Sequence, residues 1–304
     1  MSGDTLSGFV TQYRSGFYTV HTDQGLITCH LRGRLRLKAV RRGLVTVGDR
    51  VQISLQQDGS GAIEAVEPRE RLLVRPAPGK DVERSQALLA NPDQIAVIFA
   101  CADPEPRLRM LDRFLVICEK QGIPSLIIAN KLDLVGPEKA EAIFSVYPDL
   151  GYRILYTSAS SGAGIEELRK QLTEKLTGFV GPSGVGKTSL LNALQPGLGL
   201  AVRDLSQSTL KGRHATVVRE LFRLDGGGYV ADLPGLRSLT FWDIEPEELD
   251  GYFPELRPLV ADCQFNDCSH QNEPGCAVLK AVAAGGVAPE RYQSYLRMRF
   301  GDVE

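Results

Sequence analysis

The first part of the chain, from Gly8 to about Val74, consists of short β-rich runs separated by Gly and Asp turns. Clear examples are the runs at 17–20, 26–29 and 50–53. β-Branched and aromatic residues at this spacing are typical of short strands joined by tight turns. The pattern therefore predicts a small antiparallel barrel.

After a proline-rich break at 76–79, the rhythm of the chain changes. Apolar runs of strand length now alternate with helical patterns, and this alternation predicts a parallel sheet covered on both faces. The expected strands lie at 94–100, 125–129 and 153–156, and the expected helices lie near 107–121, 137–146 and 164–176.

Past Trp242 the pattern turns helical and irregular around a group of cysteines. Pro289 is expected to begin a last helix, because proline is tolerated in a first helical turn. One stripe of that helix would carry Tyr292, Tyr295, Leu296 and Arg299.

Composition places the chain among globular proteins of two or three domains, with 304 residues, 43% hydrophobic and 24% charged. A net charge of -2 argues against a protein that coats nucleic acid by bulk electrostatics. No run approaches the roughly 18 apolar residues of a membrane span, and the N-terminus lacks the features of a signal peptide. We therefore expect a cytoplasmic protein with no membrane partner.

A phosphate-binding loop of the pattern G-x-x-x-x-G-K-[ST] stands between a short apolar strand and a helical run. Its members are Gly181, Pro182, Ser183, Gly184, Val185, Gly186, Lys187 and Thr188, followed by Ser189. In such a loop the backbone N–H groups surround the phosphates, Lys187 neutralises the β and γ oxygens, and the Thr188 hydroxyl ligates magnesium. The alternative is an ordinary glycine-rich turn with a surface lysine.

The base is predicted from a second motif, because a phosphate loop does not distinguish GTP from ATP. Asn130, Lys131 and Asp133 follow an apolar strand directly. The Asp133 carboxylate can accept from both N1–H and the 2-amino group of guanine, Asn130 can hold the loop and the purine edge, and the Lys131 stem can lie over the ring. The alternative is a helix-capping loop.

A third motif, after the next expected strand, supports the guanine interpretation. It consists of Thr157, Ser158 and Ala159, where the backbone N–H of a small residue can meet the guanine O6. A fourth motif, Asp232 with Gly235, provides a carboxylate for magnesium and an N–H for the γ-phosphate. Taken alone, this fourth motif is also compatible with a plain strand-to-turn connection.

The order of the motifs is unusual, because the guanine motifs at 130–133 and 157–159 precede the phosphate loop at 181–188. Most P-loop GTPases begin with the phosphate loop. A site built from loops at one sheet edge depends on where those loops lie, so the chain can be cut and rejoined elsewhere. The sequence therefore predicts a circularly permuted GTPase.

The cysteine group has the spacing C-x4-C-x-H-x5-C and is formed by Cys263, Cys268, His270 and Cys276. Four nitrogen and sulfur ligands suit one closed, tetrahedral, structural zinc, with no open position for a catalytic water. The alternative is free cysteines in a small core with an incidental histidine.

These residues together resemble the ribosome small-subunit-dependent GTPases of the RsgA or YjeQ family. The resemblance covers essentially the whole chain and includes the permuted motif order, the phosphate loop, the cysteine–histidine spacing and Gly212-Arg213-His214 before Thr216. Ala215 and Leu233 depart from the family pattern, in which threonine or serine is usual.

The resemblance implies an α/β P-loop GTPase with an N-terminal all-β OB-fold barrel and a C-terminal helical zinc-binding domain. The expected domains are 1–74 (OB-fold, RNA binding), 75–240 (permuted GTPase) and 241–304 (zinc-binding). The implied activity is GTP phosphohydrolysis to GDP and phosphate, with magnesium, during late maturation of the small ribosomal subunit and stimulated by it. The expected partners are that subunit and its rRNA, and the expected state is a monomer.

For catalysis, the candidates are Lys187, Thr216 and His214. Leu236 stands where Ras-like enzymes place a water-orienting glutamine, and its side chain cannot position a water. The resemblance points to His214 as the substitute, and Thr216 becomes the magnesium-sensing threonine. Alternatively, His214 contacts RNA or phosphate.

A basic stripe is expected on the barrel. Arg32, Arg34, Arg36 and Lys38 alternate with small or apolar residues, so on a strand the four cations share one face. We interpret the stripe as RNA-binding, since OB-folds commonly bind nucleic acid through such a surface, although a solvated strand face explains the pattern too. One alternative is a nucleic-acid-binding regulatory module with weak or vestigial hydrolysis, against which Lys187, Thr188 and Asp232 count. Another is an ATP-using nucleotide kinase, against which Asp133 counts.

Overall fold

The computed structural model describes residues 5–33, 45–76, 85–198, 220–233 and 244–301. By its internal contacts the chain divides into two compact units. The first unit comprises residues 1–95, 165–180 and 187–238, and the second comprises residues 96–164, 181–186 and 239–304.

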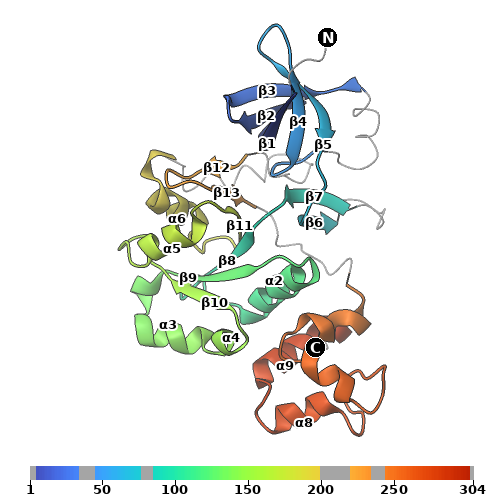
Figure 1. The fold of residues 1–304 in the computed structure, drawn as a ribbon. Helices are drawn as coiled ribbons and strands as arrows, with labels where there is room; N and C mark the ends of the chain where they lie inside the picture. Colours follow the sequence, from blue (N-terminus) through green and yellow to red (C-terminus); the bar gives the residue numbers. More distant parts are fainter. Residues whose placement is uncertain (1–4, 34–44, 77–84, 199–219, 234–243, 302–304) are drawn as a thin grey trace. The chain divides into compact units, whose positions relative to one another are not determined.

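The N-terminal part of the first unit is a closed five-stranded barrel with the strand order β1-β2-β3-β5-β4 (Figure 1). Alternate side chains of these strands, among them Val20, Val51 and Ile53, fill its interior. The strands are β1 (Thr5–Arg14), β2 (Phe17–Thr22), β3 (Gly25–Leu31), β4 (Arg50–Leu55) and β5 (Gly61–Val66).

The prediction of an antiparallel barrel is wrong at one seam, because β3 and β5 pair in parallel. The other four pairs of neighbours in the ring run antiparallel. Five strands cannot alternate direction all the way round a closed ring, so one parallel pair is unavoidable.

A six-stranded sheet has the order β10-β9-β8-β11-β13-β12 (Figure 1). The pairs β10–β9 and β11–β13 are parallel, whereas the edge strand β12 runs antiparallel to β13. All seven residues of β8 are buried, as expected for a central strand covered on both faces. The strands are β8 (Gln94–Ala100), β9 (Ser125–Asn130), β10 (Arg153–Tyr156), β11 (Leu176–Val180), β12 (Phe222–Arg223) and β13 (Tyr229–Asp232).

The helices that accompany this sheet largely match the sequence expectations. They are α2 (Leu108–Lys120), α3 (Pro137–Phe144), α4 (Val146–Asp149), α5 (Ile165–Leu172) and α6 (Lys187–Leu194), with the 3-10 turns η1 (Leu132–Leu134) and η2 (Pro196–Leu198). The helix expected at 164–176 ends at Leu172, because β11 begins at Leu176. The helix expected at 137–146 is divided into α3 and α4.

The proline-rich break holds more structure than predicted. Pro76 is the last residue of β6 (Leu72–Pro76), which pairs antiparallel with β7 (Ser85–Ala90). The chain therefore forms a two-stranded ribbon here, which the run of prolines and glycine did not suggest.

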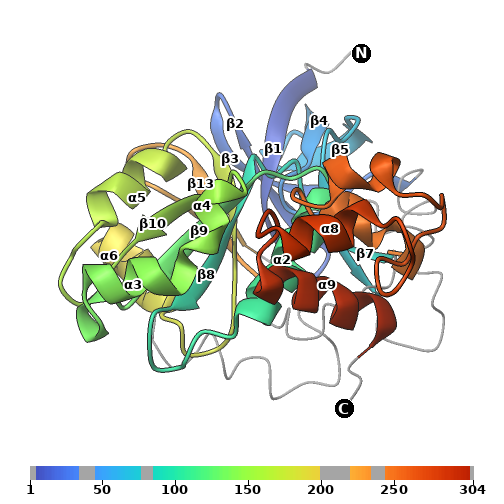
Figure 2. The ribbon, with the colours of Figure 1, turned by 90° about the horizontal axis from the view of Figure 1, so that it is seen from below.

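The C-terminal part of the second unit is helical and packs against helix α2 (Figure 2). Phe253, Leu256, Val278 and Tyr295 form its core together with Val116 of α2. The elements are η4 (Pro246–Tyr252), η5 (Arg257–Asp262), α8 (Ala277–Ala283) and α9 (Pro289–Phe300), so the last helix begins at Pro289 as predicted. None of the helices in the described parts of the chain has the length and apolar content that a membrane crossing needs.

Candidate nucleotide site and metal centre

Asn130 connects three of the predicted nucleotide motifs within the second unit. It is the last residue of β9 and is buried. Its Nδ2 atom donates to the carbonyl of Val185 in the phosphate loop at 2.8 Å, and its Oδ1 atom accepts from the Thr157 hydroxyl at 3.1 Å. A fully buried amide with both ends bonded holds its surroundings in one arrangement. The side chain therefore fixes the phosphate loop against both guanine motifs.

Two glycines allow this close packing of the phosphate loop. Gly181 has φ +147°, and a Cβ atom there would lie 2.1 Å from the carbonyl oxygen of Ile98. Gly186 has φ +94°, and a Cβ atom there would lie 2.4 Å from Asn130 Nδ2. A side chain at either position would collide with its neighbour, in a backbone conformation that favours glycine. The motif glycines are thus required by geometry.

Asp133 is held in place by Ser158 from the third motif. The Ser158 hydroxyl donates to Asp133 Oδ1 at 2.5 Å and accepts from the Ser161 N–H at 3.1 Å. This hydrogen bond from Ser158 is the main cause that keeps the pKa of the Asp133 carboxyl below its ordinary value. At neutral pH Asp133 is therefore a carboxylate, which only accepts hydrogen bonds, as recognition of guanine N1–H and N2–H requires.

Two of the three backbone N–H groups of the third motif donate within the protein. The N–H of Thr157 donates to Ala129 O and the N–H of Ser158 donates to Ala163 O, both at 2.9 Å. Because these two donors are engaged, Ala159 is the member of the predicted trio that fits contact with the guanine O6. The bond from Ser158 to Asp133 joins side chains 25 positions apart, and sequence reasoning missed it.

Lys131 links the guanine motif to the loop that follows β8. It adopts a left-handed conformation with φ 61°, and its Nζ atom donates to the carbonyl of Asp103. The backbone N–H of Cys101 in the same loop donates to Asn130 O at 2.7 Å. The long side chain is thereby anchored at its end, which suits the predicted role of its stem as one wall of the purine site.

In the first unit, α6 begins at Lys187, so Thr188 and Ser189 lie in its first turn. Asp232 ends β13 and is only 7% exposed. Burial raises the pKa of its carboxyl, and the charge of Lys187 opposes that shift. Within the described residues, Asp232 Oδ1 has no hydrogen-bond partner. A buried carboxylate oxygen without a partner is unfavourable, and a divalent cation would satisfy it. The residues present therefore fit magnesium.

Several predicted site residues lie outside the described residues, namely His214, Thr216, Gly235, Arg34, Arg36 and Lys38. Arg32, the first cation of the predicted stripe, is described. Its side chain is 63% exposed and forms an ion pair with Glu64 of β5.

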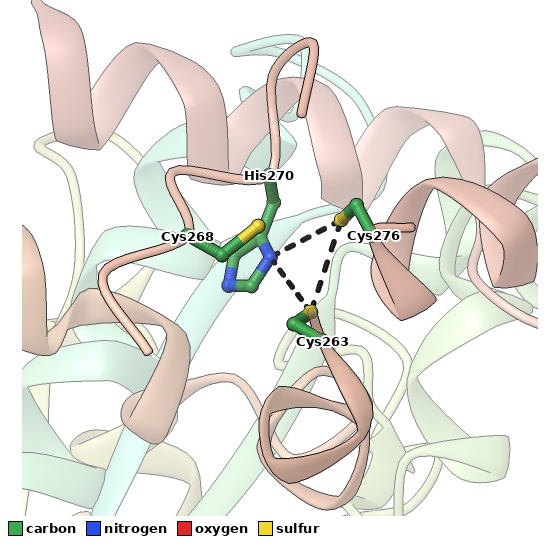
Figure 3. A group of neighbouring side chains, drawn as sticks. All are labelled: Cys263, Cys268, His270 and Cys276. Carbon is green, nitrogen blue, oxygen red and sulfur yellow. Dashed lines mark hydrogen bonds between the residues drawn. The ribbon is translucent and has the colours of Figure 1, made fainter. Parts of the chain in front are cut away.

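The four predicted metal ligands meet in the C-terminal part of the second unit (Figure 3). The ligand atoms of Cys263, Cys268, His270 and Cys276 all lie within 4.8 Å of one another. His270 Nδ1 is 3.4 Å from Cys276 Sγ and 3.6 Å from Cys263 Sγ, and these two sulfurs are 3.9 Å apart. Three thiols and one imidazole at such separations could hold a metal ion.

Surrounding groups orient these ligands as expected for a metal centre. His270 Nε2 is 3.0 Å from Asp250 Oδ2, which leaves Nδ1 directed at the sulfurs. The backbone N–H of Ala277 donates to Cys263 Sγ at 3.4 Å. Burial alone would raise the pKa of the Cys263 thiol, but hydrogen bonds, with that from Ala277 the foremost, lower it below its ordinary value. Burial raises the pKa of Cys268 to about 12, so that thiol needs a cation to ionise at neutral pH.

The fold and these motifs define a class: a P-loop GTPase of circularly permuted order, with an N-terminal barrel and a C-terminal Cys3His cluster. Comparison with known families gives the family within that class. The RsgA GTPase model matches residues 66–242 and the RsgA N-terminal domain model matches residues 7–63. The chain belongs to the RsgA GTPase family.

Individual relatives agree over nearly the whole chain. The small ribosomal subunit biogenesis GTPase RsgA of Gemmatimonas aurantiaca is 45% identical over 298 residues, which is 97% of each chain. The protein of the same name from Moorella thermoacetica is 42% identical, over 96% of this chain and 95% of its own length. Among solved structures, YjeQ from Thermotoga maritima has a TM-score of 0.81 at 37% identity and covers 98% of both chains. YloQ, a circularly permuted GTPase, has a TM-score of 0.74 at 32% identity, over 97% of this chain and 94% of its own.

Proposed function

We propose that this protein binds the small ribosomal subunit and hydrolyses GTP to GDP and phosphate during late maturation of that subunit, with the subunit stimulating hydrolysis. The observation that carries the GTPase assignment is the position of Asn130, which joins the phosphate loop at Val185 to the guanine motif at Thr157. The ribosomal assignment is supported by the names of the relatives, which describe GTPases of small ribosomal subunit biogenesis.

The base would be recognised by Asp133, oriented by Ser158, with Ala159 at the guanine O6 and Lys131 against the ring. The Asp133 carboxylate, held by one hydroxyl, still has free acceptor positions. Guanine can donate to them from N1–H and N2–H, whereas adenine has no donors at these positions. The remaining GTP contacts are assigned to the phosphate loop, residues 181–188, with Ser189 and Gly235.

For the reaction, Lys187 would neutralise the β and γ oxygens, while Thr188 and Asp232 would hold magnesium. When bound, magnesium neutralises the charge that develops on the phosphates. Orientation of the attacking water is assigned to His214 and closure around the γ-phosphate to Thr216. These two assignments rest on the family pattern of the sequence, since both residues lie outside the described residues.

The cluster of Cys263, Cys268, His270 and Cys276 is proposed to bind one structural zinc. Three thiolates and one imidazole favour zinc, and four protein ligands leave no coordination position for a catalytic water. We further assign residues 1–74 to an RNA-binding OB-fold domain, 75–240 to the GTPase domain and 241–304 to the zinc domain of a cytoplasmic monomer. Arg32, Arg34, Arg36 and Lys38 are the proposed rRNA contacts.

The test is phosphate release from GTP by the purified protein with and without purified small ribosomal subunits, across a series of salt concentrations. We expect slow turnover alone, strong stimulation by the subunits, and stimulation that falls steeply with salt, because phosphate contacts release counterions. The double variant Arg34→Glu/Arg36→Glu should lose most of the stimulation and keep its turnover in isolation. A control with two reversed charges on exposed helix positions, Lys139→Glu/Lys170→Glu, should be stimulated like the wild type. Full stimulation of the Arg34/Arg36 variant would refute the proposed contact surface, and no stimulation of wild type would refute the ribosomal assignment.

A further inference from the structure

Helix α9 carries two rows of polar contacts that reach different parts of the second unit. One row, Arg291 and Ser294, contacts helix α2. In the other row, Tyr292 and Tyr295 contact the loop that holds the metal ligands, and Arg299 approaches Asp250 of η4, which bonds His270. Residues three or four apart share a face of a helix, so the two rows are neighbouring stripes of one short element.

The first row ends on a buried carboxylate in α2. Arg291 is 1% exposed, and its Nη1 atom is 2.6 Å from Asp112 Oδ1, while its Nε atom is 2.6 Å from Glu255 Oε1. The Ser294 hydroxyl donates to the other oxygen of Asp112, and the Tyr147 hydroxyl donates to Asp112 Oδ1 at 2.8 Å. Asp112 is thus a buried charge whose bonds come from α9 and α4.

The second row bonds to the backbone around the metal ligand His270. The Tyr292 hydroxyl donates to the backbone carbonyl of His270 at 2.6 Å, and the Tyr295 hydroxyl donates to the carbonyl of Ser269 at 3.1 Å. Asp250, which bonds His270 Nε2, is also approached by Arg299 Nη1 at 4.0 Å. The position of α9 is therefore tied to the conformation of residues 269 and 270.

Helix α2 in turn follows the loop that touches the guanine motif. That loop contains Cys101, whose N–H donates to Asn130 O, and Asp103, whose carbonyl accepts from Lys131. A continuous set of bonded groups thus runs from the metal ligands through α9 and α2 to the guanine-binding residues, all of it within one compact unit.

We propose that metal binding and guanine-nucleotide binding are thermodynamically coupled through α9, with Arg291 as the positioning residue. The inference rests on the proposed nucleotide and zinc sites. Without a metal the ligand loop loses its cross-links and the Tyr292 and Tyr295 bonds loosen, so α9 is held less firmly. When α9 shifts, Arg291 shifts away from Asp112. A buried carboxylate that loses its guanidinium partner is strongly disfavoured, so Asp112 must move as well. Helix α2 and its preceding loop must then readjust, which weakens the guanine site.

Coupling of this kind is reciprocal for equilibrium affinities, which provides two independent measurements. GDP affinity is measured by fluorescence titration of the full-length protein, zinc-loaded and zinc-depleted. Zinc affinity is measured by competition with a chromogenic chelator, with and without saturating GDP, starting from the loaded native protein. We expect zinc to tighten GDP binding, and GDP to tighten zinc binding, by the same factor of about fivefold or more, within the usual range for coupled sites. Equal zinc affinities with and without GDP would overturn the coupling.

Variants on each row test the route. Tyr292→Phe removes one bond to the ligand loop and keeps the ring, and Arg291→Lys keeps the charge without the two-carboxylate geometry. Both should reduce the coupling factor toward one, with Arg291→Lys retaining more of it than Arg291→Gln. Gln293→Ala, on the exposed side of α9, should leave the factor unchanged. Wild-type coupling in Tyr292→Phe and Arg291→Lys would overturn the role of α9.

The experiment distinguishes failure of the proposed zinc and nucleotide sites from failure of the coupling between them. Loaded wild-type protein must contain zinc and bind GDP before either affinity is compared. Absence of zinc or of GDP binding would refute the proposed sites and this inference together, whereas a coupling factor of one with both ligands bound refutes the inference alone.

Discussion

Replacement of Asp133 by asparagine should change which purine the protein binds. Ser158 donates its hydroxyl hydrogen to Asp133 Oδ1 at 2.5 Å. In the Asp133→Asn variant only the amide oxygen can accept that bond, so the oxygen stays beside Ser158 and the NH2 group takes the position of the other carboxylate oxygen. The base then meets a donor at one of the two positions where it met acceptors, and a neutral acceptor at the other. Guanine offers donors at N1 and N2, whereas xanthine offers a carbonyl at position 2.

The size of the effect follows from the bonds that are exchanged. A hydrogen bond to a charged group contributes about 1.5–3 kcal/mol and a neutral one about 0.5–1.5 kcal/mol, so losing one charged bond and weakening the other to a neutral bond amounts to roughly 2.5–4.5 kcal/mol. Because Asp133 lies at an exposed position, we expect the lower end, about 100-fold weaker GDP binding at about 1.4 kcal/mol per decade. Xanthosine diphosphate should gain affinity, since the amide donates to its 2-carbonyl.

The assay is a competition titration of a fluorescent guanine nucleotide with GDP and with xanthosine diphosphate, for wild type and variant. Asp149→Asn, at an exposed position at the end of α4, serves as the matched control and should bind as the wild type does. Equal loss of affinity for both nucleotides in Asp133→Asn would refute the role of Asp133 in base recognition, because a general disturbance of the loop would then explain the loss.

Two further predictions concern the metal centre and the buried carboxylate. Purified protein should contain about one zinc per chain. Cys268→Ser should lower the free energy of unfolding, measured by denaturant titration, by more than it weakens the free energy of GDP binding. A metal-free protein of unchanged stability would contradict this. Because burial raises the pKa of Asp232, its contribution to stability is present below the unfolded carboxyl pKa and is lost as pH rises through the folded value. In magnesium-free protein without nucleotide, Asp232→Asn should therefore raise the melting temperature at pH 7, with a gain that shrinks on acidification, and should abolish magnesium-dependent stabilisation by GTP. A variant that melts at or below wild type at pH 7 would contradict the assignment.

The nucleotide motifs form clear patterns in the sequence because the residues of each motif are close together along the chain. The phosphate loop needs glycines at fixed positions, and Gly181 and Gly186 lie where any side chain would collide with a neighbour. Apolar runs also predicted the observed ends of β8, a central strand with all seven residues buried, and of β10, an edge strand.

Other features depend on partners far away in the chain and leave no local pattern. Asp112 resembles any polar position of an amphipathic helix, yet it pairs with Arg291, 179 positions later. The third motif suggested only a backbone N–H from a small residue, whereas the Ser158 hydroxyl orients Asp133. The parallel seam between β3 and β5 follows from closing five strands into a ring, which no strand shows by itself. The end of α5 at Leu172 is set by the position of β11, not by a break in its helical pattern.

The most direct test of the central claim, a guanine-specific P-loop GTPase built from permuted motifs, is steady-state phosphate release from GTP and from ATP by the purified full-length protein with magnesium. The Lys187→Ala variant, which removes the phosphate-neutralising charge, defines the background. We expect slow release from GTP well above that background, and release from ATP equal to it. Equal release from both nucleotides would contradict guanine recognition by Asp133, and release from GTP no faster than in Lys187→Ala would contradict hydrolysis at this site.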